Sequence, residues 1–188
     1  MKHVVLVALA ALSVSPWMHA AAQSNPSATA AASVPARPKD VASVDAIIDA
    51  LYDANTILVD RKRDADRFRS LFLPGARLMP TAGSGTAPRV IRVLTVEDYV
   101  RQASSGQPRH GFSEREIART TEAFGNIVQA FSTYETHRDS TDTQPIRGIN
   151  SIQLFNDGSR WWVVSVLWDN ARPDKPIPPE FLPRRPSN

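Results

Sequence analysis

The 188-residue sequence predicts an α+β fold in which N-terminal helices pack on a curved antiparallel sheet. Apolar residues recur with a helical period between residues 43 and 72, and they alternate with polar residues from residue 112 onward. An Asp-Gly pair at 157–158 is typical of a hairpin between two antiparallel strands. Helices followed by consecutive hairpin strands are typical of the α+β class.

Two helices are expected at the start of the folded domain. Residues 43–60 carry apolar side chains at three- and four-residue spacing, and Ser43 is a plausible N-cap. Residues 64–72 form the second helix, which begins at Asp64 and ends before Pro74-Gly75. The side chains expected in the core are Val44, Ile47, Ile48, Leu51, Tyr52, Phe68, Leu71 and Phe72.

Short strands and a third helix follow. Strands are expected at 76–79 and 89–94, on either side of a loop at 80–88. Thr95 is the expected cap of a helix over 95–102.

The second half of the domain is expected to form long strands. The period-two segments are 113–123, which is polar on both faces, and then 126–138, 147–155 and 160–169. The last of these carries large side chains on both faces, which indicates a central strand covered on both sides.

Composition excludes several classes of protein. The chain has 22 Lys and Arg against 19 Asp and Glu, a net charge of +3, which is too small to indicate a nucleic-acid partner. It has no Cys, so it has no disulfide framework, thiolate metal site or Cys nucleophile. Four His with scattered acids define no metal-ligand spacing, and we expect neither a metal nor a cofactor.

The ends of the chain lie outside this domain. Residues 1–22 combine Lys2, an apolar run at 4–14 and small residues before Gln23, which is the layout of a cleaved signal peptide. The apolar run is too short for a membrane anchor, so we expect periplasmic or secreted protein, with cleavage after Ala22. Residues 23–40 predict a disordered linker, 41–170 the folded domain, and 171–188 a loose Pro-rich tail, with docking through Phe181-Leu182 as the alternative.

The element order and several motifs resemble the SnoaL-like members of the nuclear transport factor two superfamily, also described as cystatin-like. The motifs that carry the resemblance lie at 112–117 (FSEREI), 124–127 (FGNI), 131–135 (FSTYE), 148–154 (GINSIQL) and 157–162 (DGSRWW). The resemblance covers about residues 41–170 and implies a cone-shaped sheet around a pocket that helices close. It also implies a homodimer. It implies no activity by itself, because this fold carries enzymes, binding proteins and interaction modules.

The candidate acid–base residues are Glu114, Glu116, Tyr134 and Asp60. Glu114 and Glu116 are two residues apart and therefore share one face of a strand, either inside the pocket or in a solvated ion-pair network. Arg115 and Arg119 are expected together on the opposite face. Enzymes with this fold include some that use an Asp-Arg-Asp set, for which Asp60 and Arg67 are available, although no motif assigns them.

Six other residues are candidates for ligand binding. Amides in apolar strands need partners when they are buried, and a ligand carbonyl is one such partner, whereas a neighbouring strand is another. Trp162 and Trp168 are six residues apart, so they share a face in a regular strand. The candidates are Tyr52, Gln129, Asn150, Gln153, Trp162 and Trp168.

Three functions remain open from the sequence. The first is binding of a small apolar molecule in the conical pocket. The second is acid–base catalysis of the isomerase, dehydratase or hydrolase kind, and the third is a dimeric interaction module whose Pro-rich tail docks a partner. Whether the chain is an enzyme is not decided by its sequence.

Signal-peptide cleavage is directly testable. Removal of 22 of the 188 residues leaves a mature chain of 166 residues that begins at Gln23. N-terminal sequencing and the intact mass of protein recovered from a bacterial periplasmic extract will check this. A chain that keeps Met1 would contradict the prediction.

Overall fold

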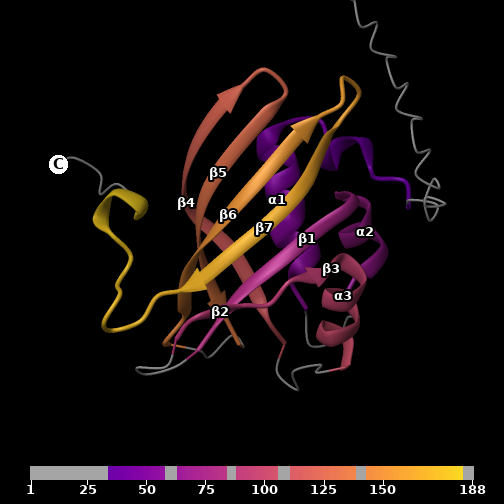
Figure 1. Cartoon of the computed structure of the whole chain (residues 1–188). Coiled ribbons are helices and arrows are strands. Elements are labelled where there is room, and N and C mark those ends of the chain that lie inside the picture. The colour runs from indigo at the N-terminus through magenta and orange to yellow at the C-terminus, as the bar shows by residue number, and fades with distance from the viewer. Residues whose placement is uncertain (1–33, 58–62, 84–87, 106–110, 139–142, 184–188) are drawn as a thin grey trace, which may run out of the picture. The chain divides into compact units, whose positions relative to one another are not determined.

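The computed structural model describes residues 34–57, 63–83, 88–105, 111–138 and 143–183 (Figure 1). All of these lie within one compact unit, Ala31–Asn188. The expected signal peptide at 1–22, and residues 23–33 of the expected linker, lie outside the described residues. None of the helices in the described ranges is long and apolar enough to cross a membrane.

The helices begin where their caps predict. In α1 (Val44–Asn55) the Ser43 side chain accepts a hydrogen bond from the Ala46 amide, and in α2 (Ala65–Ser70) Asp64 accepts one from the Arg67 amide. The expectation that the first helix continues to residue 60 is wrong. It ends at Asn55, because Ile57 pairs with Phe112 in an isolated β-bridge. Helix α3 spans Val96–Ser105, and short 3-10 helices lie at Pro38–Asp40 (η1) and Pro179–Phe181 (η2).

One curved sheet of seven strands forms the other layer of the described structure. Its order is β2-β1-β7-β6-β5-β4, and β3 pairs with β1. All pairs are antiparallel except β1 with β7, so the sheet is mixed, whereas the sequence predicted an antiparallel one. The strands are β1 (Phe72–Ala82), β2 (Val90–Ile91), β3 (Leu94–Thr95), β4 (Ser113–Phe124), β5 (Ile127–His137), β6 (Ile146–Asn156) and β7 (Trp161–Asn170).

Two register shifts change which side chains face inward. In β4 the register shifts between Glu116 and Ala118, so Arg115 pairs with outward-facing Glu135 whereas Arg119 pairs with buried Ser132. The prediction that Arg115 and Arg119 share a face is therefore wrong. A β-bulge inserts one residue, and every side chain beyond it moves to the other face.

The second shift separates the two tryptophans. It lies opposite Gln153 and Leu154 of β6, between Val163 and Ser165 of β7. Trp168 therefore faces inward, but Trp162 lies on the outer face, where its indole N–H donates to Asp157 at 2.7 Å. The expected shared face of Trp162 and Trp168 is wrong because of this bulge.

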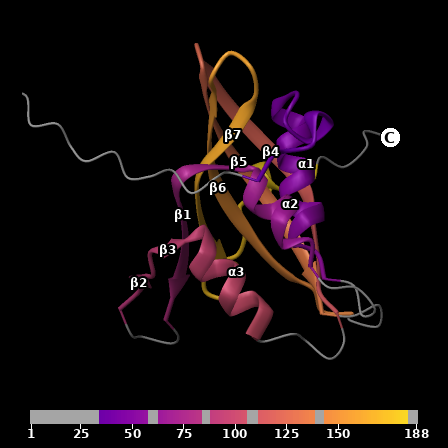
Figure 2. The same ribbon diagram turned by 90° about the vertical axis from the view of Figure 1, so that its right-hand side faces the viewer.

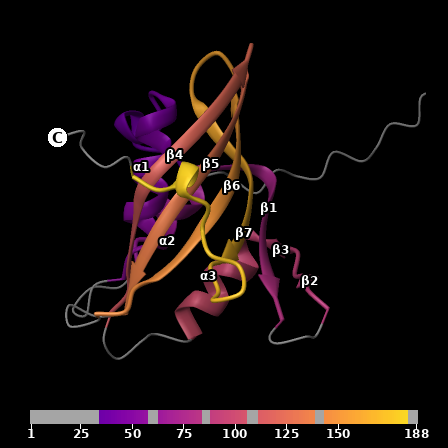
Figure 3. The same cartoon turned by 90° about the vertical axis from the view of Figure 1, so that its left-hand side faces the viewer.

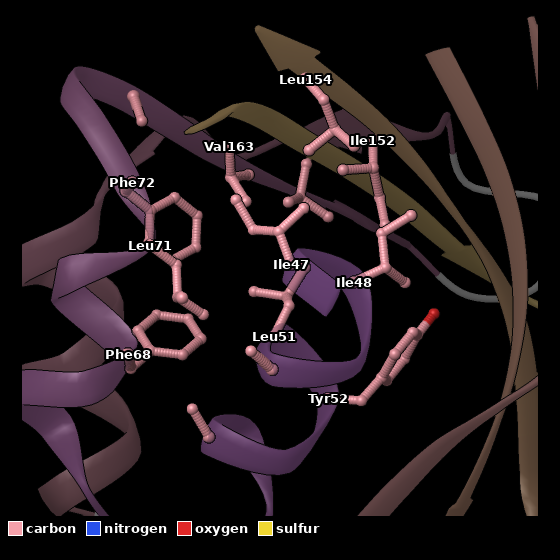
Figure 4. Packing of buried hydrophobic residues seen from close by; sticks show 14 of the residues in the cluster. Ile47, Ile48, Leu51, Tyr52, Phe68, Leu71, Phe72, Ile152, Leu154 and Val163 are labelled. Atoms are coloured by element: carbon pink, nitrogen blue, oxygen red, sulfur yellow. The ribbon is translucent and has the colours of Figure 1, made fainter. Parts of the chain in front are cut away.

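The helices cover the inner face of the sheet (Figure 2). Side chains of α1 and α2 interdigitate there with those of β1, β6 and β7 (Figure 4). The largest fully buried apolar side chains are Phe68, Ile47, Ile48, Leu71, Ile152, Leu154 and Val163. The sequence predicted the helical members of this set from their period alone.

The C-terminal tail is docked on the outer face, so the expectation of a loose tail is wrong over its described part (Figure 3). The Phe181 carbonyl accepts a hydrogen bond from Thr133 Oγ1 at 2.6 Å. The Phe131 and Phe181 rings lie 5.3 Å apart between centroids. An apolar ring and a hydroxyl on the outer face of β5 give η2 both a packing surface and a donor.

Two isoleucines allow a matched test of this core. Ile47 is fully buried and Ile127 is 58% exposed. We expect Ile47→Ala to lower the free energy of unfolding by about 2–5 kcal/mol, and Ile127→Ala to change it by less than about 0.5 kcal/mol. Urea denaturation followed by circular dichroism will measure both. Similar losses in the two variants would contradict this assignment of the core.

Candidate functional site

A cavity of about 230 Å³ lies between the inner face of the sheet and the helices. Much of its wall is apolar or aromatic, and a small group of polar side chains interrupts it. This composition is typical of sites that bind small molecules. The apolar part includes Leu51, Phe68, Leu78, Phe112, Val166 and Trp168, and the polar part includes Tyr52, Asn55, Tyr99, Glu114, Tyr134, Thr136, Asn150 and Asn170.

Glu114 is the ionisable carboxyl in this wall. It extends inward from β4 opposite Thr136, whose hydroxyl donates to Glu114 Oε2 at 3.3 Å. Burial raises the pKa of Glu114 to about 7. Hydrogen bonds from Thr136, Asn150 and Asn55 oppose this rise in the pKa, because they favour the charged form. A carboxyl of this kind can accept and release a proton near neutral pH.

A chain of hydrogen bonds joins the cavity wall to Glu116. The Asn150 amide nitrogen donates to the Tyr52 hydroxyl at 3.0 Å, and that hydroxyl lies 2.6 Å from Ser132 Oγ. Ser132 in turn donates to Glu116 Oε1. Glu116 lies near Arg119, whose Nε is 3.6 Å from the same carboxyl oxygen.

The other two tyrosines are also held by asparagines. Tyr99 donates to Asn55 Oδ1 at 2.9 Å, and Tyr134 donates to Asn170 Oδ1. Arg63 lies over Tyr99, with its Cζ 5.5 Å from the centre of the Tyr99 ring. Its charge favours the ionised form of Glu114.

The structure brings together five of the predicted site residues. Tyr52, Glu114, Tyr134, Asn150 and Trp168 all line the cavity, although they come from five different elements. The inward-facing positions of β5 and β6 pair directly, which places Asn150 beside Ser132 and Gly148 beside Tyr134.

The remaining predicted residues lie elsewhere. Gln129 and Gln153 pair with each other on the outer face, where both are exposed, because they alternate with the inward-facing residues. Trp162 is on the outer face as well, and Glu116 reaches the wall only through Ser132. Asp60 lies outside the described residues.

Arg67, which the sequence offered together with Asp60, and Glu135, which follows Tyr134, both belong to ion-pair networks. Arg67 binds Asp40 through two nitrogens, at 2.7 and 3.1 Å, and also contacts Asp53, but it does not line the cavity. Glu135 faces away from Tyr134 and binds Arg115, Arg147 and His137. Hydrogen bonds from His137 and Arg147 lower the pKa of Glu135 to about 2.

Sequence reasoning missed Asn55, Tyr99 and Thr136. Asn55 gave the clearest signal, since it is a polar residue on the buried face of α1, four residues after Leu51. Tyr99 belongs to the apolar face of the third helix, and Thr136 shares the parity of Tyr134. Among the described residues, no group of three or more His, Asp or Glu could hold a metal ion.

Comparison with known proteins identifies the fold. No family model matches the sequence, and no curated protein matches it. A Nostoc punctiforme protein of unknown function with a cystatin-like fold matches with a TM-score of 0.51 and 10% identity, over 71% of this chain and 96% of that one. An NTF2-like protein of unknown function from Pseudomonas putida has a TM-score of 0.50 and 13% identity, over 67% and 82%.

The similar structures also include one that is provisionally named a scytalone dehydratase, from Novosphingobium aromaticivorans. Its TM-score is 0.47, with 11% identity over 66% of this chain and 76% of that one, which is too distant to carry an argument about activity. The protein therefore has the NTF2-like, cystatin-like α+β fold that the resemblance implied. At these identities the likeness concerns the fold alone.

The titration of Glu114 is measurable without a ligand. A carboxyl carbon resonance that titrates near pH 7 is expected in the carbon-13 NMR spectrum, and Glu114→Gln should remove it. The folded state holds a proton that the unfolded chain releases between about pH 4.5 and 7. Wild-type stability should therefore fall through this window, relative to Glu114→Gln, by on the order of 2–3 kcal/mol.

Glu122→Gln, on the exposed part of the same strand, is the control for the titration of Glu114. It should leave both the resonance near pH 7 and the pH dependence of stability unchanged. A Glu114 resonance that titrates near pH 4.5 would contradict the assignment.

Proposed function

We propose that this protein binds a small, largely apolar molecule in the cavity and transfers a proton to or from it through Glu114. The observation that carries the proposal is the position of Glu114, a carboxyl at the wall of a largely apolar cavity of about 230 Å³. Burial raises the pKa of Glu114 and hydrogen bonds from three side chains oppose that rise, so the pKa lies at about 7. General acid–base groups work best when their pKa is close to the working pH.

The size of the cavity limits what it can hold. A dry cavity of about 150 Å³ is large enough for benzene, so about 230 Å³ accommodates one substituted ring or a molecule of similar size. Trp168 and Phe68 provide flat apolar surfaces for such a molecule. Proton transfer at carbon or oxygen, as in isomerisation or elimination, requires only a positioned acid–base group.

The proposal places this chemistry in an exported protein. The support for export, and for a periplasmic or secreted location, is the signal-peptide layout of residues 1–22. The homodimer rests on the resemblance and stays a prediction.

A chemical probe tests the proposal without a known substrate. In 5-nitrobenzisoxazole, a base removes the C–H proton, the N–O bond breaks, and a coloured cyanophenolate forms. We expect the protein to accelerate this ring opening, with a rate that rises through an inflection near pH 7 as Glu114 ionises. Glu114→Gln should lower the rate by about 100-fold or more.

Glu122→Gln makes the same chemical change on the outer, exposed part of β4 and should keep the wild-type rate. Equal rates for wild type and Glu114→Gln would overturn the assignment of Glu114 as the base.

A further inference from the structure

A second hollow lies on the outer face of the sheet, between that face and the C-terminal tail (Figure 3). Its volume is about 410 Å³, and residues of β1, β5, β6 and β7 line it on one side and residues 175–181 of the tail on the other. Glu114 lines the cavity on the inner face and not this hollow, which we call the outer groove. Most of its wall is apolar, with contributions from Phe131, Ile149, Leu167, Ile177, Pro178 and Phe181.

The floor of the outer groove is apolar because of the side chains that these strands direct outward. Phe131 and Leu167 lie in one row across β5, β6 and β7, and Ile149 belongs to the neighbouring row on the same face. In the next row toward the hairpin turns, Gln129 pairs with Gln153, and both are exposed. The apolar floor therefore lies where the tail crosses the sheet and ends where the tail does not cover it.

The part of the tail that covers this floor is fixed at both ends. Soon after β7, Arg172 and Lys175 exchange two backbone hydrogen bonds of 3.1 and 2.9 Å, which form a turn. At the far end, the Phe181 carbonyl is held by the Thr133 hydroxyl. Three of the five residues at 176–180 are proline, which restricts the backbone and supplies no N–H group. A stiff segment anchored at both ends keeps the groove open and offers few hydrogen-bond donors to a bound molecule.

Two charged residues line the outer groove, Asp169 and Lys175, and they differ in their partners. Asp169 is already bound, because Arg172 Nη1 lies 2.9 Å from both of its carboxyl oxygens and the Thr81 hydroxyl donates to it at 2.6 Å. Asp174 also lies near Arg172, at 3.6 Å from its Nε. Lys175 is exposed and forms no ion pair within the described ranges. The groove thus combines an apolar wall with one cation that is free to pair with a ligand.

We infer that the outer groove binds an amphiphilic anion, a carboxylate on an unbranched alkyl chain such as a medium-chain fatty acid. The groove extends from Thr81 on β1 to Phe131 on β5, across four neighbouring strands, which is about 14 Å at the usual strand spacing. A dry cavity of about 150 Å³ holds benzene, so about 410 Å³ has room for a chain of about eight carbons. The chain lies on the apolar floor, and the carboxylate pairs with Lys175. This site is separate from Glu114 and goes beyond the proposed function.

Three eight-carbon compounds that differ in their head group test this site. At pH 8 octanoate is an anion, octan-1-ol is neutral and octylammonium is a cation. NMR titration will measure their dissociation constants and will show which methyl resonances shift. We expect shifts at Ile149 and Leu167, and we expect octanoate to bind about two- to fivefold more tightly than octan-1-ol, the effect of one partly exposed ion pair. Octylammonium should bind more weakly than the alcohol.

Two matched pairs of variants locate the site. Lys175→Gln removes the cation and should abolish the preference for octanoate over octan-1-ol, whereas Lys39→Gln, on η1, should keep it. Ile149→Ala removes part of the floor and should weaken both ligands by about three- to tenfold, because less apolar surface is buried. Ile127→Ala, at a 58% exposed position outside the groove, should leave both affinities unchanged. The wild-type comparison and the exposed Lys175→Gln variant test the site even if Ile149→Ala does not fold.

Four results would overturn this inference. Equal affinities for the three compounds would show that Lys175 selects no anion, and the absence of binding by all three would show that there is no site. Shifts confined to Leu51 and Leu78 would place octanoate in the inner cavity instead. Resonances of Ile149 and Leu167 that move with protein concentration, together with sedimentation as a dimer, would show that a second copy covers the groove. None of these results bears on the reaction expected of Glu114, so the proposed function is tested separately.

Discussion

The packing of α1 on the inner face of the sheet is the interaction on which the rest of this structure depends. Ile47 and Ile48 are fully buried against β6 and β7, and this fixes the rotation of the helix. One turn later, Tyr52 directs its hydroxyl away from the apolar cluster (Figure 4), within reach of Ser132 and Asn150. The apolar contact therefore positions the polar network. A helix rotated by one residue would lose both the burial of the two isoleucines and the hydrogen bonds of Tyr52.

Burial of polar groups next to this core is costly unless each has a partner. Tyr52, Tyr99 and Tyr134 each pair with a side chain from a different element, so these bonds tie α1 to β5, α3 to α1 and β5 to β7. Glu114 differs from them. Its hydrogen-bond donors offset only part of the free-energy cost of burying the charged carboxylate. The rest of that cost raises the pKa of Glu114 to about 7. The same cost that weakens the fold at high pH makes the carboxyl useful for proton transfer.

The outer face of the sheet has a different role. Its apolar and hydroxyl groups near Phe131 and Thr133 are covered by the C-terminal η2 segment, and its charged groups gather around Glu135. Glu114 and Glu135 lie on opposite faces of the sheet, and burial dominates at Glu114 while ion pairing dominates at Glu135. Two carboxyls of nearly equal intrinsic acidity thus differ by several pKa units because of what surrounds them.

The sequence by itself determined the α+β class, the helical core positions and the order of the long strands, because 3.6- and two-residue periods are local properties of the chain. The alternation of side chains along a strand also predicted that Glu114, Tyr134 and Asn150 face the opposite side of the sheet from the residues directly before and after them. Only the tertiary structure decided where the two β-bulges fall, because an inserted residue depends on contacts with the facing layer. Those bulges moved Trp162 and Arg119 from their expected faces. The pairing of Tyr52 with Ser132 likewise joins residues 80 positions apart, and no local pattern encodes such a contact.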